Sequence, residues 1–371
     1  MIIGIPKEVK VDEFRVGVTP KNVALLIKEG HEVLVQSGAG VGSGFSDEDY
    51  ISVGARAVSD AKDVYDGAAL IIKVKEPQSS EYGFLNKKHT LFCYLHLAPL
   101  KELTSVLAEK KVCAIAYETV AVANELPLLK PMSEIAGKMA PIVAAHYLSR
   151  YQGGEGVLIS GADGVKPAKV LIIGAGNAGF NAAKMAIGMD ADVTVMNRTT
   201  PKLEQLQKLL HVKTVLYSPQ IILEIINEFD IVISTVLIHG GASAPKLITL
   251  EVLKAMREGA VFVDVAIDQG GTAESSKPTT HTNPIFIKEG VLHYCVANMP
   301  GAYPKTSSVA LSNATISYAR KLANEGTLNA VKNDASLALG VNVYNGVVTN
   351  PSVAQAHNLE FKSIELCLEG K

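Results

Sequence analysis

The stretch KVLIIGAGNAGF at residues 169–180 decides the fold. Its first part, Lys169–Ile173, is a β-branched, apolar run typical of a fully buried parallel strand. Three glycines follow in the pattern Gly-x-Gly-x-x-Gly and open an apolar helical segment. In a dinucleotide-binding βαβ unit, Gly174 makes the tight turn, Gly176 lets a pyrophosphate approach the backbone, and Gly179 lets helix and strand pack closely. The surrounding strand and helix favour a dinucleotide site over a glycine-rich turn that binds nothing.

The end of the next strand, about twenty residues further on, is where NAD enzymes place an acid that binds the ribose hydroxyls. This chain has Asn197 there, followed by Arg198. A carboxamide can still hydrogen-bond a hydroxyl, and a guanidinium is suited to a 2′-phosphate. A solvated loop cation is an equally acceptable interpretation of Arg198. The sequence therefore leaves the choice between NAD and NADP open.

The alternation of β-branched runs with polar helical stretches predicts two doubly wound α/β domains. Strands are expected first at 2–5, 32–35, 70–74, 90–94 and 112–117, with helices at 20–29 and 100–110. A second series is expected at 169–173, 192–196, 213–216, 231–234, 260–265 and 291–295, enough for a complete dinucleotide-binding domain. A helix from Ser133 to Tyr151, capped by Ser133, is expected to link the two series.

The last part of the chain is too short to form another α/β domain. Helices are expected at 307–323 and 336–339, followed by a polar tail that includes Val341 to Val348. The economical assignment folds these residues back onto the first domain. We therefore predict a catalytic domain made of residues 1–130 and 305–371, with a Rossmann domain, residues 131–304, inserted in it.

Composition excludes several classes of function. The formal net charge is −2, so no excess of one sign points to nucleic acid or to an acidic membrane surface. No apolar run approaches the ~18 residues of a membrane span, and the first residues lack the pattern of a secretory signal, which predicts a cytoplasmic protein. The four cysteines form no Cys-x-x-Cys pair and are expected to be reduced structural thiols, with no metal site.

Motifs along most of the chain resemble one enzyme family. GIPKE at 4–8 and RVGVTP at 15–20 resemble the opening shared by alanine dehydrogenases and the NAD-binding subunit of proton-translocating transhydrogenases. The resemblance is to alanine dehydrogenases specifically, and extends from residue 1 to about 350, through KVKEP at 73–77, YLHLA at 94–98, VDVAIDQGG at 263–271, SKPTTH at 276–281 and YCVANMP at 294–300.

This resemblance implies reversible oxidative deamination of L-alanine to pyruvate and ammonium, with a nicotinamide cofactor, in a homohexamer. It makes Arg15 and Lys75 the substrate-binding residues, and His96 and Asp268 the acid–base residues. The glycine motif and the resemblance together assign cofactor contacts to Ser133, Gly174, Gly176, Asn177, Ala178, Gly179, Asn197, Lys202, Ser218, Leu237, Ile238, Val265, Ala266, Ile267, Asp268, Lys277, Val296, Ala297, Asn298 and Met299. Family members usually carry an acid at position 197 and often an arginine at 277, so this chain departs at both.

The four candidate side chains suit the chemistry of an amino-acid dehydrogenase. A guanidinium binds a carboxylate with two parallel hydrogen bonds, which suits Arg15, and Lys75 would hold the carboxylate and polarise the keto oxygen. An imidazole exchanges protons near neutral pH, so His96 is the natural acid–base group. Asp268 follows a strand of the second domain, and we expect domain closure to bring all four together. Asp264 is expected to be a local loop carboxylate.

Three other functions remain possible from the sequence. A transhydrogenase subunit shares the N-terminal motif, but the presence of both His96 and Asp268 disfavours it. A dehydrogenase of the same family acting on another amino acid, or using NADP, stays open because one methylene changes pocket affinity by only ~1–3 kcal/mol. A nucleotide-binding sensor that has lost catalysis is disfavoured because all four ionisable candidates are present.

Overall fold

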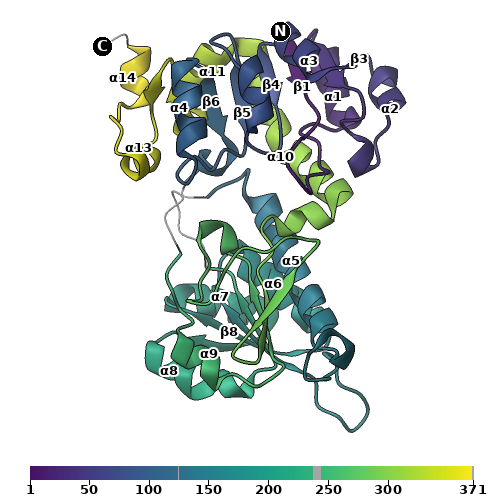
Figure 1. The fold of residues 1–371 in the computed structure, drawn as a ribbon, viewed down its shortest axis with the longest axis vertical. Helices are drawn as coiled ribbons and strands as arrows, with labels where there is room; N and C mark the ends of the chain where they lie inside the picture. Colours follow the sequence, from purple (N-terminus) through teal and green to yellow (C-terminus); the bar gives the residue numbers. More distant parts are fainter. Residues whose placement is uncertain (124, 237–243, 370–371) are drawn as a thin grey trace. The chain divides into compact units, whose positions relative to one another are not determined.

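The computed structural model describes residues 1–123, 125–236 and 244–369, and the chain divides into two compact units (Figure 1). The terminal unit contains both ends of the chain, Met1–Met132 and Tyr303–Lys371, and the inserted unit is Ser133–Ala302. Both units are doubly wound, mostly parallel sheets with helices on their faces, so the expected fold class is confirmed. No helix in the described ranges has both the length and the apolar character needed to cross a bilayer.

The sheet of the terminal unit has the strand order β3-β2-β1-β4-β5-β6, all parallel, with β14 and β15 added antiparallel beyond β6. The central strands are entirely buried, as expected for a parallel sheet covered on both faces. The strand order reverses between β1 and β4, and in such sheets ligands bind outside the carboxyl ends of the strands at this point. The strands are β1 Ile2–Ile5, β2 Glu32–Gln36, β3 Arg56–Val58, β4 Leu70–Ile72, β5 Thr90–Cys93, β6 Cys113–Ala116, β14 Val341–Tyr344 and β15 Val347–Val348.

The sheet of the inserted unit has the order β12-β13-β11-β10-β7-β8-β9, with β12 as an antiparallel edge. Its parallel part has the arrangement of a dinucleotide-binding fold, in which β7 is the first strand and the order reverses between β7 and β10. The strands are β7 Lys169–Ile173, β8 Asp192–Asn197, β9 Lys213–Leu216, β10 Ile231–Ser234, β11 Val261–Asp264, β12 Ile285–Lys288 and β13 Val291–Tyr294.

Helices cover the faces of both sheets. Several begin with proline in their first turn, where its fixed φ and missing N–H are tolerated. The helices are α1 Pro20–Lys28, α2 Asp47–Ser52, α3 Ala61–Gly67, α4 Lys101–Glu109, α5 Lys130–Tyr147, α6 Asn177–Gly188, α7 Thr200–Leu210, α8 Pro219–Ile225, α9 Leu250–Ala255, α10 Pro304–Glu325, α11 Thr327–Asn333, α12 Ala335–Gly340, α13 Pro351–His357 and α14 Ile364–Leu368.

The long helix α10 holds the loop between β1 and α1. Ser308 and Ser312, one turn apart, are both fully buried on the helix face that meets this loop. The Val16 N–H donates to Ser308 Oγ at 3.0 Å, and the Thr19 N–H donates to Ser312 Oγ at 3.1 Å. The backbone donors on the carboxyl side of Arg15 are therefore satisfied by serines almost three hundred residues away in sequence.

Two expectations about secondary structure were wrong. Helix α5 begins at Lys130 and ends at Tyr147, so Ser133 lies inside its first turns and does not cap it, because Pro131 starts the helix earlier. The C-terminal stretch expected to be a polar tail forms β14 and β15, which join the sheet through β6 (yellow end of the chain in Figure 1). Asn345 and Gly346 both have positive φ between these strands, the hairpin pattern that Asn-Gly favours.

The cysteines are free thiols, as expected. Cys93 and Cys295 are fully buried, and burial raises the pKa of the Cys295 thiol to about 12. Burial likewise raises the pKa of Cys113 to about 12. Thiols with such high pKa values are weak nucleophiles, which fits a structural role.

Candidate active site

A buried ion-pair network anchors the loop after β4. The Lys73 side chain is 0 % exposed, and its Nζ lies 3.1 Å from Glu8 Oε2 and 2.9 Å from Glu81 Oε1. Glu8 Oε1 also accepts a hydrogen bond from the Val74 N–H at 2.6 Å and a longer one from the Lys75 N–H at 3.4 Å. Burial raises the pKa of the Glu8 carboxyl, although the Lys73 ammonium opposes that rise. The network fixes the backbone that carries Lys75.

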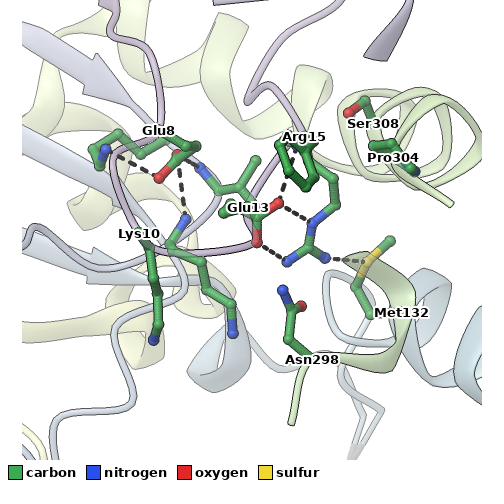
Figure 2. Close-up of polar contacts among 12 residues, drawn as sticks. Glu8, Lys10, Glu13, Arg15, Met132, Asn298, Pro304 and Ser308 are labelled. Atoms are coloured by element: carbon green, nitrogen blue, oxygen red, sulfur yellow. Dashed lines mark hydrogen bonds and ion pairs between the residues drawn. The ribbon is translucent and has the colours of Figure 1, made fainter. Parts of the chain in front are cut away.

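Arg15 is paired inside the protein. Its Nε donates to Glu13 Oε1 at 2.7 Å, its Nη2 donates to Glu13 Oε2 at 2.5 Å, and its Nη1 lies 3.1 Å from the Met132 sulfur (Figure 2). The guanidinium is 2 % exposed. Burial would raise the pKa of Glu13, but the Arg15 charge and hydrogen bonds lower it to about 2. The carboxylate of Glu13 therefore binds one edge of the guanidinium that was expected to bind substrate, and the sequence contains no sign of this pair.

Lys75 lies beside this pair. Its positive charge contributes to lowering the pKa of Glu13, which places the two groups close together. The residue is 7 % exposed, yet within the described part of the chain its ammonium makes no hydrogen bond and no ion pair. A buried cation is costly unless it is paired, so this position favours an anionic ligand.

His96 is held in an unusual backbone conformation after β5. Its φ is +46°, a left-handed value that is uncommon for a residue with a side chain. The Glu118 carboxylate accepts hydrogen bonds from the backbone N–H groups of Leu95 at 3.2 Å and of His96 at 2.6 Å, and its Oε1 lies 4.0 Å from His96 Nδ1. The imidazole stacks on the Tyr94 ring with centroids 5.9 Å apart, and about a third of its side chain is exposed.

Tyr94 connects His96 with Arg15. Its ring is 3 % exposed, and its hydroxyl donates to the Leu128 carbonyl at 2.6 Å. Burial raises the pKa of Tyr94, which therefore stays neutral, and the Arg15 charge acts on it in the opposite direction. The terminal unit thus brings Arg15, Lys75 and His96 to one edge of its sheet.

Sequence reasoning missed the two carboxylates that arrange these residues. Glu118 lies two residues after β6, the neighbour of β5, so the rule that functional residues gather at the carboxyl ends of adjacent strands could have identified it. Glu13 lies two residues before Arg15 in an irregular segment, and no pattern predicts that it turns back onto the guanidinium.

The glycine motif of the inserted unit has the geometry that a dinucleotide requires. Gly174 has φ +110°, and a Cβ on Gly179 would lie 1.9 Å from the Gly174 carbonyl oxygen, so only glycine allows this turn and this packing. A Cβ on Gly176 would meet nothing within 4 Å. The backbone in front of α6 is therefore open to a ligand, and the helix N-terminus behind it favours phosphate. The residues present fit the pyrophosphate of a dinucleotide.

The end of β8 is held by the Asn197 side chain. Its Oδ1 accepts from the Ala175 N–H at 3.3 Å, which ties it to the glycine loop. Its Nδ2 donates to the Thr199 carbonyl at 3.1 Å and to Thr199 Oγ1 at 2.9 Å. Arg198 and Lys202 follow, both with exposed side chains.

The loop after β11 carries Asp268 on its surface. Asp264 is 0 % exposed and accepts from the N–H groups of Ala266 at 3.1 Å and Thr272 at 2.7 Å and from Ser276 Oγ at 2.6 Å. Its expected role as a local loop carboxylate is therefore confirmed. Asp268 lies in the short 3₁₀ turn Ile267–Gln269 and is exposed.

The other expected cofactor residues also lie in the inserted unit. Asn177 and Ala178 begin α6, Val265–Asp268 follow β11, and Val296–Met299 follow β13, all at the edge of the sheet where the strands end. Ser133 is on α5, which packs so closely on α6 that a Cβ on Gly137 would lie 2.2 Å from the Ala178 carbonyl oxygen.

Two of these residues are engaged locally, and two are not described. The Ser218 hydroxyl accepts from the Ile221 N–H at 3.1 Å and caps α8, while the Lys277 ammonium lies 4.4 Å from the centre of the Phe286 ring. Leu237 and Ile238 lie outside the described residues. In the described ranges, no group of three or more His, Cys, Asp or Glu side chains is arranged to hold a metal ion.

Comparison with known proteins gives one consistent answer. The family model "Alanine dehydrogenase/PNT, N-terminal domain" matches residues 4–136, and its C-terminal counterpart matches residues 140–351. An alanine dehydrogenase of Staphylococcus epidermidis is 49 % identical over 373 residues and covers 100 % of both chains. Alanine dehydrogenase 2 of Staphylococcus aureus is 48 % identical with the same coverage.

Solved structures agree with this result. An L-alanine dehydrogenase superposes with a TM-score of 0.92 at 45 % identity, over 96 % of this chain and 99 % of that one. A transhydrogenase from Sinorhizobium meliloti superposes with a TM-score of 0.80 at 26 % identity, over 95 % of this chain and 100 % of that one. The resemblance expected from the sequence motifs is confirmed, and the chain belongs to the alanine dehydrogenase/PNT family.

Proposed function

We propose that this chain catalyses the reversible oxidative deamination of L-alanine to pyruvate and ammonium with NAD as a cofactor. Two relatives that are 48–49 % identical to this chain over its full length are alanine dehydrogenases. A solved structure that superposes on it with a TM-score of 0.92 is an L-alanine dehydrogenase. On the same resemblance we propose a homohexamer that works in the cytoplasm.

The observation that carries the proposal is the unpaired, buried ammonium of Lys75. It lies close to Glu13 and Arg15, whose opposite charges largely balance each other. The positive charge of Lys75 therefore favours the binding of an anion. The carboxylate shared by alanine and pyruvate would supply that charge. Arg15, which also contacts the Met132 sulfur, would contribute to binding the same carboxylate through its positive charge.

The residues of this chain also supply the proton transfers. A bound nicotinamide would supply the acceptor for the hydride of the alanine Cα. A proton must then leave the water that adds to this carbon, and another must reach the departing ammonia. We assign these transfers to the His96 imidazole, which is partly exposed and held by Glu118, and to the exposed carboxylate of Asp268.

The residues that would hold the cofactor are those at the strand ends of the inserted unit. The α6 N-terminus behind Gly176 would bind the pyrophosphate. The Asn197 Oδ1 has a second lone pair besides the one that the Ala175 N–H uses, so it can accept from a ribose hydroxyl.

The test is a spectrophotometric assay of the reduced nicotinamide with L-alanine, and with pyruvate and ammonium in reverse. We expect turnover in both directions. Lys75→Met should raise KM for alanine and pyruvate by at least about 30-fold, because a buried charge pair is lost. Lys101→Met, which removes an exposed cation at the start of α4, is the matched control and should change nothing.

Two further experiments test the role of His96 and the alternative functions. His96→Ala should lower kcat by roughly 100- to 10,000-fold with cofactor affinity preserved. Unchanged turnover in that variant would remove His96 from the mechanism. If cofactor binds but alanine is not oxidised, a panel of other amino acids would separate a different substrate from a sensor without activity.

A further inference from the structure

The segment that follows β8 has an unusual charge for a ribose-binding position. Residues 197–203 read NRTTPKL, with two cations and no acid. In dinucleotide-binding folds this position faces the adenosine ribose, where a carboxylate selects NAD and a nearby arginine accommodates the 2′-phosphate of NADP. The glycine loop beside it, Gly174–Gly179, has the geometry of a pyrophosphate site. We call this loop and the segment 197–203 the dinucleotide cradle.

Asn197 occupies the position of the selecting acid and is fixed there. Its three hydrogen bonds to Ala175 and Thr199 hold the carboxamide between the glycine loop and the start of α7. A carboxylate at this position would repel a 2′-phosphate, whereas the neutral amide does not. The position therefore lacks the group that excludes NADP.

The two cations of the segment are both exposed. Among the described residues, neither Arg198 nor Lys202 makes a hydrogen bond or an ion pair, although both side chains are exposed at the same end of α7. They are four residues apart, so they flank the first turn of this helix. That turn contains no acid, and a cation beside a helix N-terminus is unfavourable unless an anion balances it. Arg198 also lies within electrostatic range of Tyr217, just beyond β9.

From these observations we propose that the ribose end of the cradle accepts a 2′-phosphate, bound by Arg198 with support from Lys202, so that the chain uses NADP as well as NAD. The inference rests on the proposed function for the identity of the cofactor class, and it goes further by naming the residues that set its specificity. NAD remains a cofactor because Asn197 Oδ1 can still accept from a ribose hydroxyl.

Binding of nucleotide fragments tests the inference without any turnover. We would measure by calorimetry the affinity of the whole protein for 2′,5′-ADP and for 5′-AMP, which differ only by the 2′-phosphate. The first should bind about tenfold more tightly, as expected for a charge-assisted hydrogen bond. Because the added interaction is electrostatic and exposed, the advantage should shrink when the salt concentration is raised.

Three variants and one control locate the effect. Arg198→Ala should remove most of the advantage of 2′,5′-ADP, and Lys202→Ala should remove a smaller part. Asn197→Asp should reverse the preference, lowering the affinity for 2′,5′-ADP relative to 5′-AMP by about 100-fold through charge repulsion. Lys208→Ala, an exposed cation at the other end of α7, should leave the ratio unchanged. The ratio of kcat/KM for NADP and NAD should follow the same order.

Specific results would overturn the inference. Equal affinity of the native protein for the two fragments would do so, as would an effect of Arg198→Ala no larger than that of Lys208→Ala. These outcomes are independent of the proposed reaction: if 2′,5′-ADP binds as expected and alanine is not oxidised, the reaction is wrong and the phosphate site stands. If alanine is oxidised with NAD but NADP does not bind, the proposed reaction is supported and the proposed 2′-phosphate site is wrong.

Discussion

At the residue scale, the site depends on carboxylates that do not themselves react. Glu8 and Glu81 hold Lys73, Glu13 holds Arg15, and Glu118 holds the backbone of His96. Glu8, Glu13 and Glu118 each accept hydrogen bonds from a candidate site residue or from its neighbour in the chain. The cost of burying charge is thus offset by pairing, and Lys75 alone of these cations is left for a ligand.

Glu118 gives a prediction about the positioning of His96. Glu118→Ala should lower kcat by about tenfold or more with little change in KM for the cofactor, because the strained backbone of His96 loses its acceptor. In Glu118→Gln the amide oxygen still accepts from the two N–H groups, so most of kcat should return. Steady-state kinetics on both variants provide the measurement, and an alanine variant as active as the native enzyme would contradict it.

Glu13 gives a prediction about acid stability. Its folded pKa of about 2 lies below the ordinary value of 4.5, so the ionised form stabilises the fold at neutral pH. This contribution is complete above about pH 4.5 and is lost as the pH falls towards 2. Urea unfolding between pH 7 and pH 2.5 should show a shallower acid decline in Glu13→Gln than in the native protein.

Glu13→Gln should also lower the free energy of unfolding at neutral pH, and Glu228→Gln is its control. Glu13→Gln leaves the buried Arg15 without its counter-ion, which should lower the free energy of unfolding by about 3 kcal/mol at pH 7. Glu228→Gln removes a carboxylate from an exposed pair with Lys169 and should leave the unfolding curve unchanged. Equal behaviour of the two variants would show that the Glu13–Arg15 pair does not stabilise the fold.

At the element scale, helix α10 is as important to the site as the strands are. Its buried serines satisfy backbone donors of the loop from Val16 to Thr19, directly after Arg15. Figure 1 shows this helix (light green) within the terminal unit, far along the chain from the purple segment that it supports. Val16 and Val18 of this loop are buried as well, so apolar packing and these hydrogen bonds together determine its path.

Ser312→Ala tests this role. Thr19 N–H and Asn22 Nδ2 both donate to Ser312 Oγ, and the substitution would leave both donors buried without this acceptor. Stability should fall by about 1–3 kcal/mol, and KM for alanine should rise because Arg15 is less well placed. Ser317→Ala, on the exposed side of α10, is the control and should change stability by less than about 0.5 kcal/mol. A thermal midpoint of Ser312→Ala equal to that of the control would refute the role.

At the scale of the whole molecule, two units of similar design carry different chemistry. The order of the parallel strands reverses at β1 and β4 in the terminal unit and at β7 and β10 in the inserted unit, so each sheet has its own switch point. The first is surrounded by charged side chains suited to a small carboxylate, and the second by the glycine loop suited to a dinucleotide. Binding of cofactor and binding of substrate are thus assigned to separate units of one chain.

The proposed assembly gives a prediction at this scale. Light scattering after gel filtration should give the mass of six chains at neutral pH. Because the formal net charge is only −2, repulsion between copies is weak and the mass should not depend on salt. A monomeric mass together with full activity would show that catalysis does not need the assembly.

Much of this protein is determined by local sequence. The strands β1, β7 and β10 have the bounds expected from their apolar runs, because a strand buried on both faces needs an uninterrupted apolar sequence. The sequence of the glycine motif also predicts its geometry. A Cβ on Gly179 would clash with Gly174 of the same motif, and a Cβ on Gly174 would clash with Thr235, just after the neighbouring strand β10. The positions of His96 and Asp268 after strand ends follow from the same reasoning.

Only the tertiary structure decides what these side chains contact. The acceptor role of Glu118 and the buried serines of α10 join segments whose sequence patterns contain no sign of one another. The pair of Glu13 with Arg15 is local in sequence, but it depends on the irregular path of the backbone that carries both residues. The same holds for β14, a short strand that exists because β6 offers it an edge. Hydrogen bonds and ion pairs between distant segments depend on how the backbone folds as a whole, so sequence alone predicts the elements and the candidate residues, while packing determines which charges are paired and which one remains for a ligand.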